Sequence, residues 1–504
     1  MKKILHLIAA VLAGCSASIP ESRMEVVKKG VPLRWSASPE ALAGIDTNWV
    51  RRLGGSRAEA LVSEAFRRNP DMRVAAERVN RAIASAKSAG AAMKPQVSAG
   101  LNTSRQKQLF IGIPLGGEGG IPSANFSNFG ANMTVSWEPD IWGLRRAEQA
   151  ALLADAQAEG NAYRAARASL AAQVMRSWLA LAEANEQIML AMETQELLRA
   201  TKEIVIDRYN NALAADGGSA AEVRLAESEV ATNKALIAQR KGEREQAVRQ
   251  LELLLGRYPK GILQGVVFLP EVPATPPSGL PSELLLRRPD ILEAERRFAS
   301  SGSLVKKAKR ASYPSFNLTS GAGTTTDTMR TIFNSDFGVW SLAGGLTQPI
   351  WAGGKLRTEY AKYQGDDRSK LAELQSVVLK AFGEVEQAMV AEKFLFSREQ
   401  AIIEALKFAE EATDAAASEY AGGLGEVLTL ITAQRSRINL ASQKTTLKRL
   451  RLDNRITLHL ALWGLSISKL SDYENCHYDH RCYRYRPRID YFWSLSSQGK
   501  CARS

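Results

Sequence analysis

The sequence is poor in cysteine and histidine, and no cysteine occurs between Cys15 and Cys476. A disulfide framework therefore cannot hold the main part of this 504-residue chain together. The four histidines lie near the two ends, at His6, His459, His477 and His480. The main part thus lacks the side chain used most often for acid and base chemistry, and HExxH, nucleophile-elbow and P-loop motifs are absent. No enzyme is indicated.

Long apolar runs are also missing. After residue 20 no run of eighteen apolar residues occurs, which excludes a helix that crosses a bilayer. Single-sign charge blocks are absent too, because the Lys and Arg residues behind the net charge of +13 are spread beside Glu and Asp. This pattern argues against a nucleic-acid partner.

The first residues have the layout of a secretory signal. Lys2 and Lys3 precede a short apolar stretch, and small residues surround the expected cleavage point. The ending "LAGC" resembles a bacterial lipobox, which implies that residues 1–14 are removed and that Cys15 is lipidated. Ser16 stands where a retention signal would have Asp, so the resemblance implies sorting to the outer membrane. The alternative is an ordinary signal with an incidental cysteine.

Part of the chain occurs twice. "RRPDILEAERR" at residues 287–297 resembles "RNPDMRVAAERV" at residues 68–79. The spacing between their prolines, Pro70 and Pro289, is the same as the spacing between Pro95 and Pro314 in the stretches that follow. Equal spacing with similar neighbours indicates an internal duplication.

Each repeat contains two candidate strands. Apolar and polar residues alternate near 96–104 and 131–138, and again around Phe316 and from Trp340 to Thr347. Such alternation suits a wall between lipid and water, although a half-buried soluble sheet has it as well. Closed barrels need about eight strands, so four strands in lipid require several chains. The segments 110–130 and 321–336, rich in Gly, Ser and Asn, are interpreted as loops.

The remainder is predicted to be helical. Proline-free stretches at 144–211 and 355–420 would each extend roughly 100 Å as helices. Each is followed by a glycine cluster and a second helix of about 35 residues, which makes a helical hairpin. The clusters contain Gly217 and Gly218 in the first repeat and Gly422, Gly423 and Gly425 in the second. Helices at 70–93 and 290–312 complete the repeats.

Several stretches together resemble the TolC-like outer-membrane efflux family, in its lipoprotein branch that works with resistance-nodulation-division pumps. They are "LAGC", "WEPDIWGLRR" (137–146), "LELLLGRYP" (251–259), "LPSELLLRRPDILEAERR" (280–297), "YPSFNLTSGAG" (313–323), "LTQPIWAGGKLR" (346–357) and "GEVLTLITAQ" (425–434). The resemblance implies a mainly α fold with a small β-barrel part. Long helical hairpins would form a periplasmic tunnel, and three chains with four transmembrane strands each would form a trimeric 12-stranded barrel.

The resemblance also implies a periplasmic gate and a domain order. Glu426 matches a position at which the family often carries an acidic ring, although a solvated Glu at a helix start explains it equally well. The expected parts follow in order: signal peptide 1–14, lipid-anchored segment 15–59, first repeat 60–259, linker 260–282, second repeat 283–465 and a tail at 466–504. The tail departs from the family pattern and is predicted to be disordered, with no metal site at Cys476, His477, His480 and Cys482.

The predicted function is that of a passive outer-membrane exit duct, without catalysis or cofactor. A homotrimer would receive drugs or small solutes from an inner-membrane resistance-nodulation-division transporter through a periplasmic adaptor protein, and it would contact outer-membrane lipid. The first alternative is a duct for type I protein secretion. The second is a lipid-anchored periplasmic coiled-coil scaffold without a pore.

Overall fold

The computed structural model divides the chain into two units, residues 1–465 and 466–504. It describes residues 17–28, 31–32, 34–37, 48–110, 123–211, 219–263, 265, 268–274 and 281–463. The second unit, the predicted signal peptide, Cys15, Gly217 and Gly218 therefore lie outside the described residues.

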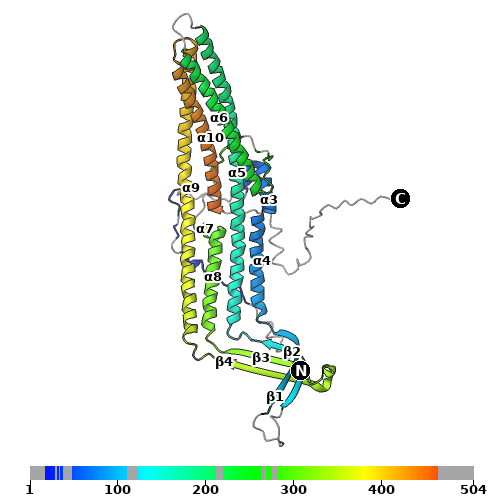
Figure 1. The fold of residues 1–504 in the computed structure, drawn as a ribbon. Coiled ribbons are helices and arrows are strands. Elements are labelled where there is room, and N and C mark those ends of the chain that lie inside the picture. The colour runs from blue at the N-terminus through cyan, green and yellow to red at the C-terminus, as the bar shows by residue number, and fades with distance from the viewer. Residues whose placement is uncertain are drawn as a thin grey trace, which may run out of the picture. The chain divides into compact units, whose positions relative to one another are not determined.

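Helices make up most of the first unit (Figure 1). They are α2 (Glu25–Lys28), α3 (Trp49–Arg68), α4 (Pro70–Ala91), α5 (Leu144–Asn211), α6 (Ala220–Leu254), α7 (Pro281–Arg287), α8 (Pro289–Arg310), α9 (Lys355–Ala421) and α10 (Val427–Trp463). The two predicted rods are confirmed as α5 and α9, with 68 and 67 residues. The sequence did not predict α3, which contains two glycines and has left-handed backbone at Gly55. None of the described helices is long and apolar enough to cross a membrane.

The repeated phrase lies where two equivalent helices begin. In α4 the Asn69 side chain accepts a hydrogen bond from Asp71 N at 2.8 Å, which caps the helix before Pro70. In α8 the corresponding residue is Arg288, and its side chain does not cap the helix. Its guanidinium instead bonds Asp290 and Glu384, each at 2.7 Å, and so ties α8 to α9. Asn69 and Arg288, which occupy corresponding positions, therefore make different contacts.

The four strands form one antiparallel sheet in the order β1-β2-β3-β4. Their bounds are β1 (Gln96–Leu109), β2 (Ser123–Trp137), β3 (Ser315–Thr326) and β4 (Gly338–Thr347). Part of the loop prediction was wrong, because residues 123–130 belong to β2 and residues 321–326 to β3. Their Gly, Ser and Asn residues hid these strand ends, which are held by backbone bonds to the neighbouring strand.

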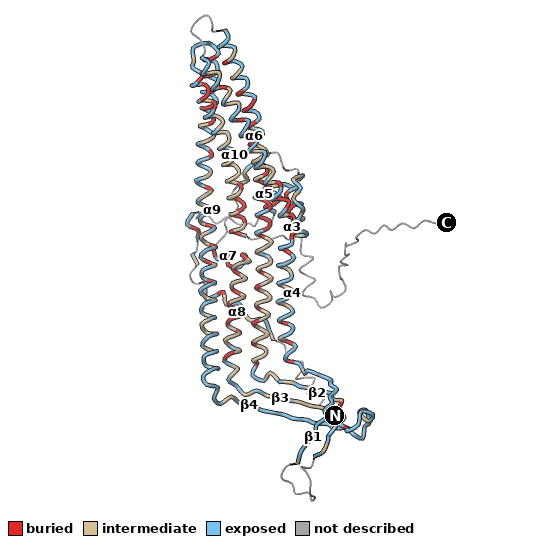
Figure 2. The backbone as a smooth tube through the Cα atoms, viewed as in Figure 1, coloured by how far each residue is buried: buried red, intermediate tan, exposed pale blue. Residues whose placement is uncertain are grey.

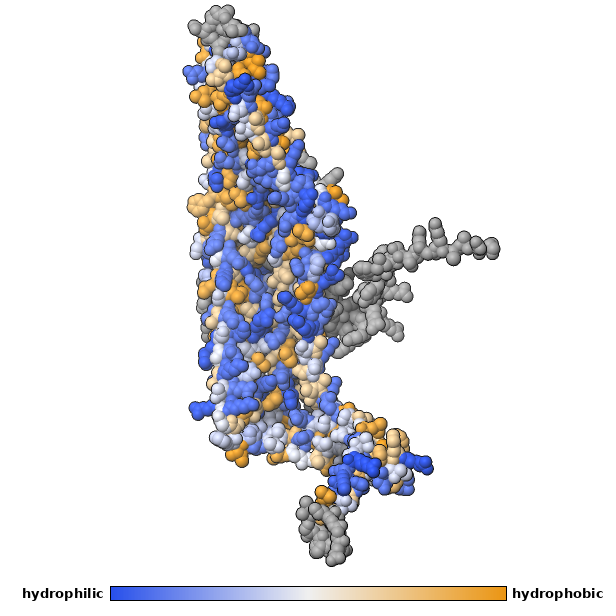
Figure 3. Space-filling view, in the orientation of Figure 1, coloured by the Kyte–Doolittle hydropathy of each residue, from blue (hydrophilic) through white to orange (hydrophobic). Residues whose placement is uncertain are grey.

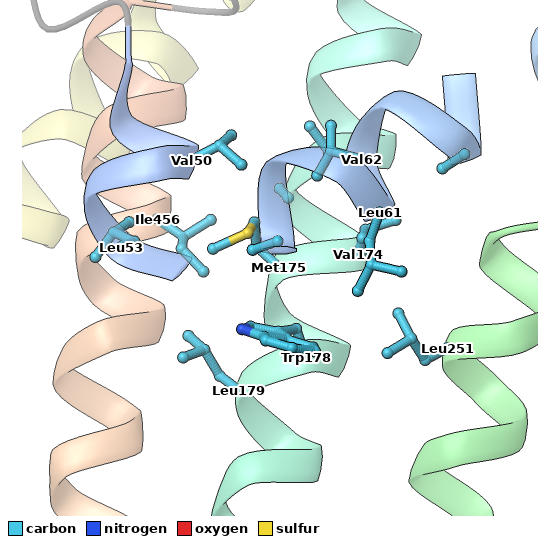
Figure 4. Close-up of a cluster of buried hydrophobic side chains, with 14 of the residues drawn as sticks. Val50, Leu53, Leu61, Val62, Val174, Met175, Trp178, Leu179, Leu251 and Ile456 are labelled. Atoms are coloured by element: carbon cyan, nitrogen blue, oxygen red, sulfur yellow. The ribbon is translucent and has the colours of Figure 1, made fainter. Parts of the chain in front are cut away.

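Burial is concentrated partway along the helices (Figure 2). Here α3 packs against α5, and Val50, Leu53, Leu61 and Val62 meet Trp178 and its neighbours on α5 (Figure 4). Residues Leu251 of α6 and Ile456 of α10 complete this central cluster. Apolar side chains also lie on the outer surface of the sheet and the long helices (Figure 3). A single chain thus leaves apolar surface uncovered.

Candidate functional site at the hairpin tips

The two helical hairpins contact each other near their tips. Val205 of α5 and Ala226 of α6 pack with five residues of the second hairpin: Ala416, Tyr420, Val427, Leu430 and Ile431. Tyr420 is only 2% exposed, although it lies one residue from the end of α9. The tip is therefore a small packed unit rather than two separate loops.

Arg208 of α5 joins the first hairpin to the turn of the second. Its Nη1 donates to the carbonyl oxygens of Tyr420 at 3.2 Å and Gly425 at 3.3 Å. Its guanidinium carbon also lies 4.7 Å from the centre of the Tyr420 ring. These carbonyls belong to the end of α9 and the following turn, where helical partners run out. A cation from one hairpin thus stabilises the end of the other.

The beginning of α6 adds a negative group to the tip. Ser219 and Glu222 form a capping box, in which Ala221 N donates to Ser219 Oγ at 3.0 Å. Burial raises the pKa of the Tyr420 hydroxyl, and the nearby Glu222 carboxylate raises it further. Tyr420 therefore stays protonated, although the nearby Arg208 guanidinium opposes part of this rise in pKa. The sequence pattern did not predict a role for Arg208, Tyr420 or Glu222, because their contacts join residues of different hairpins.

Glu426, the predicted gate residue, lies in this tip between the turn and α10. Its backbone oxygen accepts from Leu430 N at 3.3 Å, so it begins the α10 hydrogen-bond ladder. Its side chain is exposed and makes no hydrogen bond or ion pair with the described residues. Gly423, with φ of 82°, allows the turn that places Glu426 there. A role in a gate stays a prediction, because one chain contains no axis around which a ring could form.

Below the tip, charged residues join α9 to α10. Arg451 of α10 bonds Glu392 at 2.9 Å and also pairs with Glu399, both on α9. Asn454 donates to Glu392 at 3.2 Å, and Arg455 donates to the same carboxylate at 3.0 Å. Buried ion pairs are costly to break on one side only, so this network keeps α9 and α10 in register.

The opposite end carries the sheet, whose outer strands are exposed along their whole length. On one face Leu101 of β1 is 75% exposed, and Trp340 and Leu346 of β4 are 82% and 62% exposed. Large apolar groups rarely stay in water in such numbers, so this face meets an apolar environment. Within the described part of the chain, no group of His, Cys, Asp and Glu is arranged to hold a metal ion.

The family model described as "Outer membrane efflux protein" matches residues 61–257 and 280–464. The pyoverdine export outer membrane protein OpmQ of Pseudomonas aeruginosa is 28% identical over 474 residues, which cover 92% of this chain and 97% of OpmQ. The "Probable outer membrane lipoprotein SilC" of Salmonella typhimurium is 26% identical over 472 residues, covering 90% of this chain and 96% of SilC.

Solved structures agree with these sequence matches. The open state of the Neisseria gonorrhoeae MtrE outer membrane channel superposes with a TM-score of 0.73 at 25% identity. The match covers 89% of this chain and 98% of MtrE. Long helical hairpins attached to a small sheet with an apolar face define an outer-membrane channel. The chain belongs to the outer membrane efflux protein family, and it is an outer-membrane efflux channel, as the sequence predicted.

Proposed function

We propose that three copies of the chain assemble into one exit duct of a tripartite efflux system. Their strands form a twelve-stranded barrel in the outer membrane, and their helices form a tunnel through the periplasm. Drugs or other small solutes arrive from an inner-membrane resistance-nodulation-division pump through a periplasmic adaptor. The duct contributes no energy, so transport is driven by the pump.

The open edges of the sheet are the observation that carries this proposal. β1 and β4 are the outer strands, and neither outer edge is paired within the described residues. In hydrocarbon, each unpaired backbone group costs several kcal/mol. A second copy of the chain supplies the missing edge, with its β1 beside β4 of the first copy.

The internal duplication gives the register of this pairing. Gln96 pairs with Ser136 in the first repeat, and Ser315 pairs with Thr347 in the second. Gln96 of β1 is thus equivalent to Ser315 of β3, and Ser136 of β2 is equivalent to Thr347 of β4. The helix starts Leu144 and Lys355 have the same separation along the chain as Ser136 and Thr347. The strand pairing and the helix starts therefore give the same separation between equivalent residues of the two repeats.

Applying these equivalences to the β2–β3 pairs predicts the β4–β1 pairs between copies. The pair Val135 with Ser320 becomes Leu346 of one copy with Leu101 of the next. The pair Phe129 with Thr326 likewise becomes Trp340 with Lys107. Apolar Leu346 then meets apolar Leu101, while a slip by one residue would bring polar Asn102 to this face. The polarity of this pair supports the derived pairing of faces, and the duplication sets the register.

The N-terminal segment supports lipidation at Cys15. Ala17 N donates to Gln149 Oε1 at 3.2 Å, so Ala17 lies near the start of α5. The end of β2 lies close to the start of α5, because only a short corner joins the two (Figure 1). Acyl chains attached two residues before Ala17 would reach the leaflet that the strands enter. We propose this lipid anchor for the chain, in keeping with the name lipoprotein that SilC carries.

Cross-linking tests the assembly. Leu346→Cys and Leu101→Cys are combined in a background with Cys476, Cys482 and Cys501 replaced by serine. A short reagent with two thiol-reactive groups, such as a bis-maleimide, should then yield linked trimers. In the control, Leu346→Cys with Asn102→Cys, the second thiol lies on the opposite face of the sheet, and linkage should be much weaker. Equal linkage of both pairs would contradict the register.

Planar-bilayer recording of the purified protein tests the duct itself. Discrete conductance steps are expected from cross-linked trimers, and folded trimers that give no current would favour the pore-free scaffold. Cys15→Ala should abolish incorporation of radiolabelled palmitate. Incorporation by that variant would refute the anchor at Cys15.

A further inference from the structure

Two corners join the sheet to the long helices, and they differ in how their charges are satisfied. The first corner is residues 138–146, between β2 and α5, and the second corner is residues 348–357, between β4 and α9. Gly143 and Gly354, which directly precede the equivalent starts of α5 and α9, both have left-handed backbone, with φ of 79° and 84°. Both corners therefore have the same backbone turn directly before their helices, and the charged groups near these two helix starts can be compared.

The first corner satisfies its own charges. Asp140 accepts from Arg145 N at 3.0 Å and from Arg146 N at 2.8 Å, which caps α5. The Arg146 side chain pairs with the same carboxylate at 3.3 Å. Trp142 donates through Nε1 to Pro314 O at 2.8 Å and meets the Tyr313 ring edge to face. Cation, carboxylate and indole all have partners within the chain.

The second corner retains a cation but lacks its carboxylate. Arg357 is equivalent to Arg146, whereas the second corner, "QPIWAGG" at residues 348–354, has no Asp or Glu to match Asp140. Arg357 makes no hydrogen bond or ion pair within the described part of the chain, and the same holds for the Lys309 side chain at the end of α8. Trp351 and Ile350 are 88% and 95% exposed. This corner presents unpaired cations beside large apolar side chains.

A cavity of about 420 Å³ lies between these groups. Lys309, Ser312, Arg357 and Tyr360 line its polar part, and Ile350 and Trp351 line its apolar part. No Asp or Glu residue lines it. The cavity is thus complementary to a ligand with an anionic head and an apolar body.

The equivalent groove of the first repeat is filled by the chain itself. Tyr360 corresponds to Gln149, and Lys309 corresponds to Gly90. The Gln149 side chain lies directly against Gly90, where a Cβ would collide with it. Gln149 in turn accepts from Ala17 N at 3.2 Å, two residues after the proposed acylated Cys15. Gln149 and Ala17 therefore occupy the first groove, whereas no described segment fills the second.

We propose that the second corner binds the phosphate headgroup of an anionic phospholipid of the outer membrane. Lys309 and Arg357 pair with the phosphate, Ser312 and Tyr360 donate hydrogen bonds to its oxygens, and Trp351 and Ile350 lie along the acyl chains. The lipid headgroup occupies the place that the Gln149 side chain and Ala17 take in the first repeat. This inference rests on the proposed membrane location of the sheet.

The test measures lipid retained by the full-length trimer in detergent, using native mass spectrometry with phosphatidylglycerol or phosphatidylcholine. Phosphatidylglycerol should bind at about one molecule per chain. Combined Lys309→Gln and Arg357→Gln should weaken this binding roughly 30-fold, because each cation contributes a factor of about five at a lipid surface. Lys306→Gln, an exposed cation on α8 that does not line the cavity, is the matched control and should change nothing.

A second measurement tests whether the lipid binds beside Trp351. Phosphatidylglycerol with brominated acyl chains should quench the fluorescence of the wild type more than that of Trp351→Phe. Equal binding of both lipids, unchanged binding after the double substitution, or displacement by millimolar inorganic phosphate alone would overturn the proposal. So would equal quenching, the result expected if a neighbouring copy covers Trp351. If only lipid binding fails while cross-linking and conductance persist, the duct stands without this site.

Discussion

The middle of the helical part and the hairpin tips are held together in different ways. The central cluster contains 23 buried apolar residues from α3, α4, α5, α6, α10 and the chain after α6, and Trp178 within it is 1% exposed. Among the described residues, the tip cluster contains seven such residues, and Arg208 adds polar contacts between its two hairpins. The middle therefore resists separation, while the tips can separate by breaking few contacts. The predicted gate residue Glu426 lies in this part, which fewer contacts hold.

Trp178→Ala should have the largest effect on stability, because Trp178 lies in the apolar central cluster. Removing a buried aromatic side chain costs about 3 to 5 kcal/mol and leaves a cavity between α3, α5 and α6. Thermal unfolding followed by circular dichroism should show a large drop in midpoint. Met192→Ala, on an exposed part of the same helix, should show little change. A similar drop in both variants would contradict the central cluster as the main support.

Glu252→Gln tests a polar contact in the middle of the helical part. Although burial opposes its charge, hydrogen bonds from the backbone N–H groups of Gly261, Ile262 and Leu263 lower the pKa of the Glu252 carboxyl. A lowered folded pKa gives stability that is present above the unfolded pKa and lost as pH falls through the folded value. The substitution should cost about 2 kcal/mol at neutral pH.

The difference between wild type and Glu252→Gln should shrink as the pH falls below the usual carboxyl range. Unfolding midpoints measured across this range check the sign. A difference that stays constant with pH would show that the carboxylate charge is not involved. Glu245→Gln, which changes a more exposed carboxylate about two helix turns earlier, is the matched control.

Arg208→Gln weakens the contact between the two hairpins at their tips. It removes two hydrogen bonds to carbonyl oxygens and the contact with the Tyr420 ring, at a cost of about 1 to 2 kcal/mol confined to the tips. The unfolding midpoint should fall less than in Trp178→Ala, while resting conductance rises. Arg199→Gln, an exposed cation on the same helix, is the control. Unchanged conductance would mean that Arg208 does not restrain the tips.

Glu426→Gln should have the smallest effect on stability, within about 0.5 kcal/mol, because its side chain is exposed and unpaired within the described residues. If three such carboxylates face one axis, the substitution should lower the preference for cations in bilayer recordings. Identical selectivity and current in the two proteins would leave Glu426 as a solvated residue at a helix start.

The signals in the sequence that were local and strong predicted structure well. Proline-free Ala- and Leu-rich stretches predicted α5 and α9 to within one residue, and prolines placed the starts of α4 and α8. Signals that depended on side-chain alternation failed where glycine and asparagine interrupt it, as at the start of β2. The helix α3 was missed because Gly54 and Gly55 break its pattern, although its apolar residues enter the central cluster.

The sequence by itself predicted a duplication, and it determined the presence of four strands, the two long rods and the family, because each depends on spacing along the chain. Only the tertiary structure showed that Arg208 reaches the second hairpin, 212 residues away, and that the charges of the first corner have partners while described residues supply none to Arg357 in the second. These contacts join side chains that are distant in sequence. Their partners are selected by helix packing and by distances in space, and no local pattern of residues encodes either.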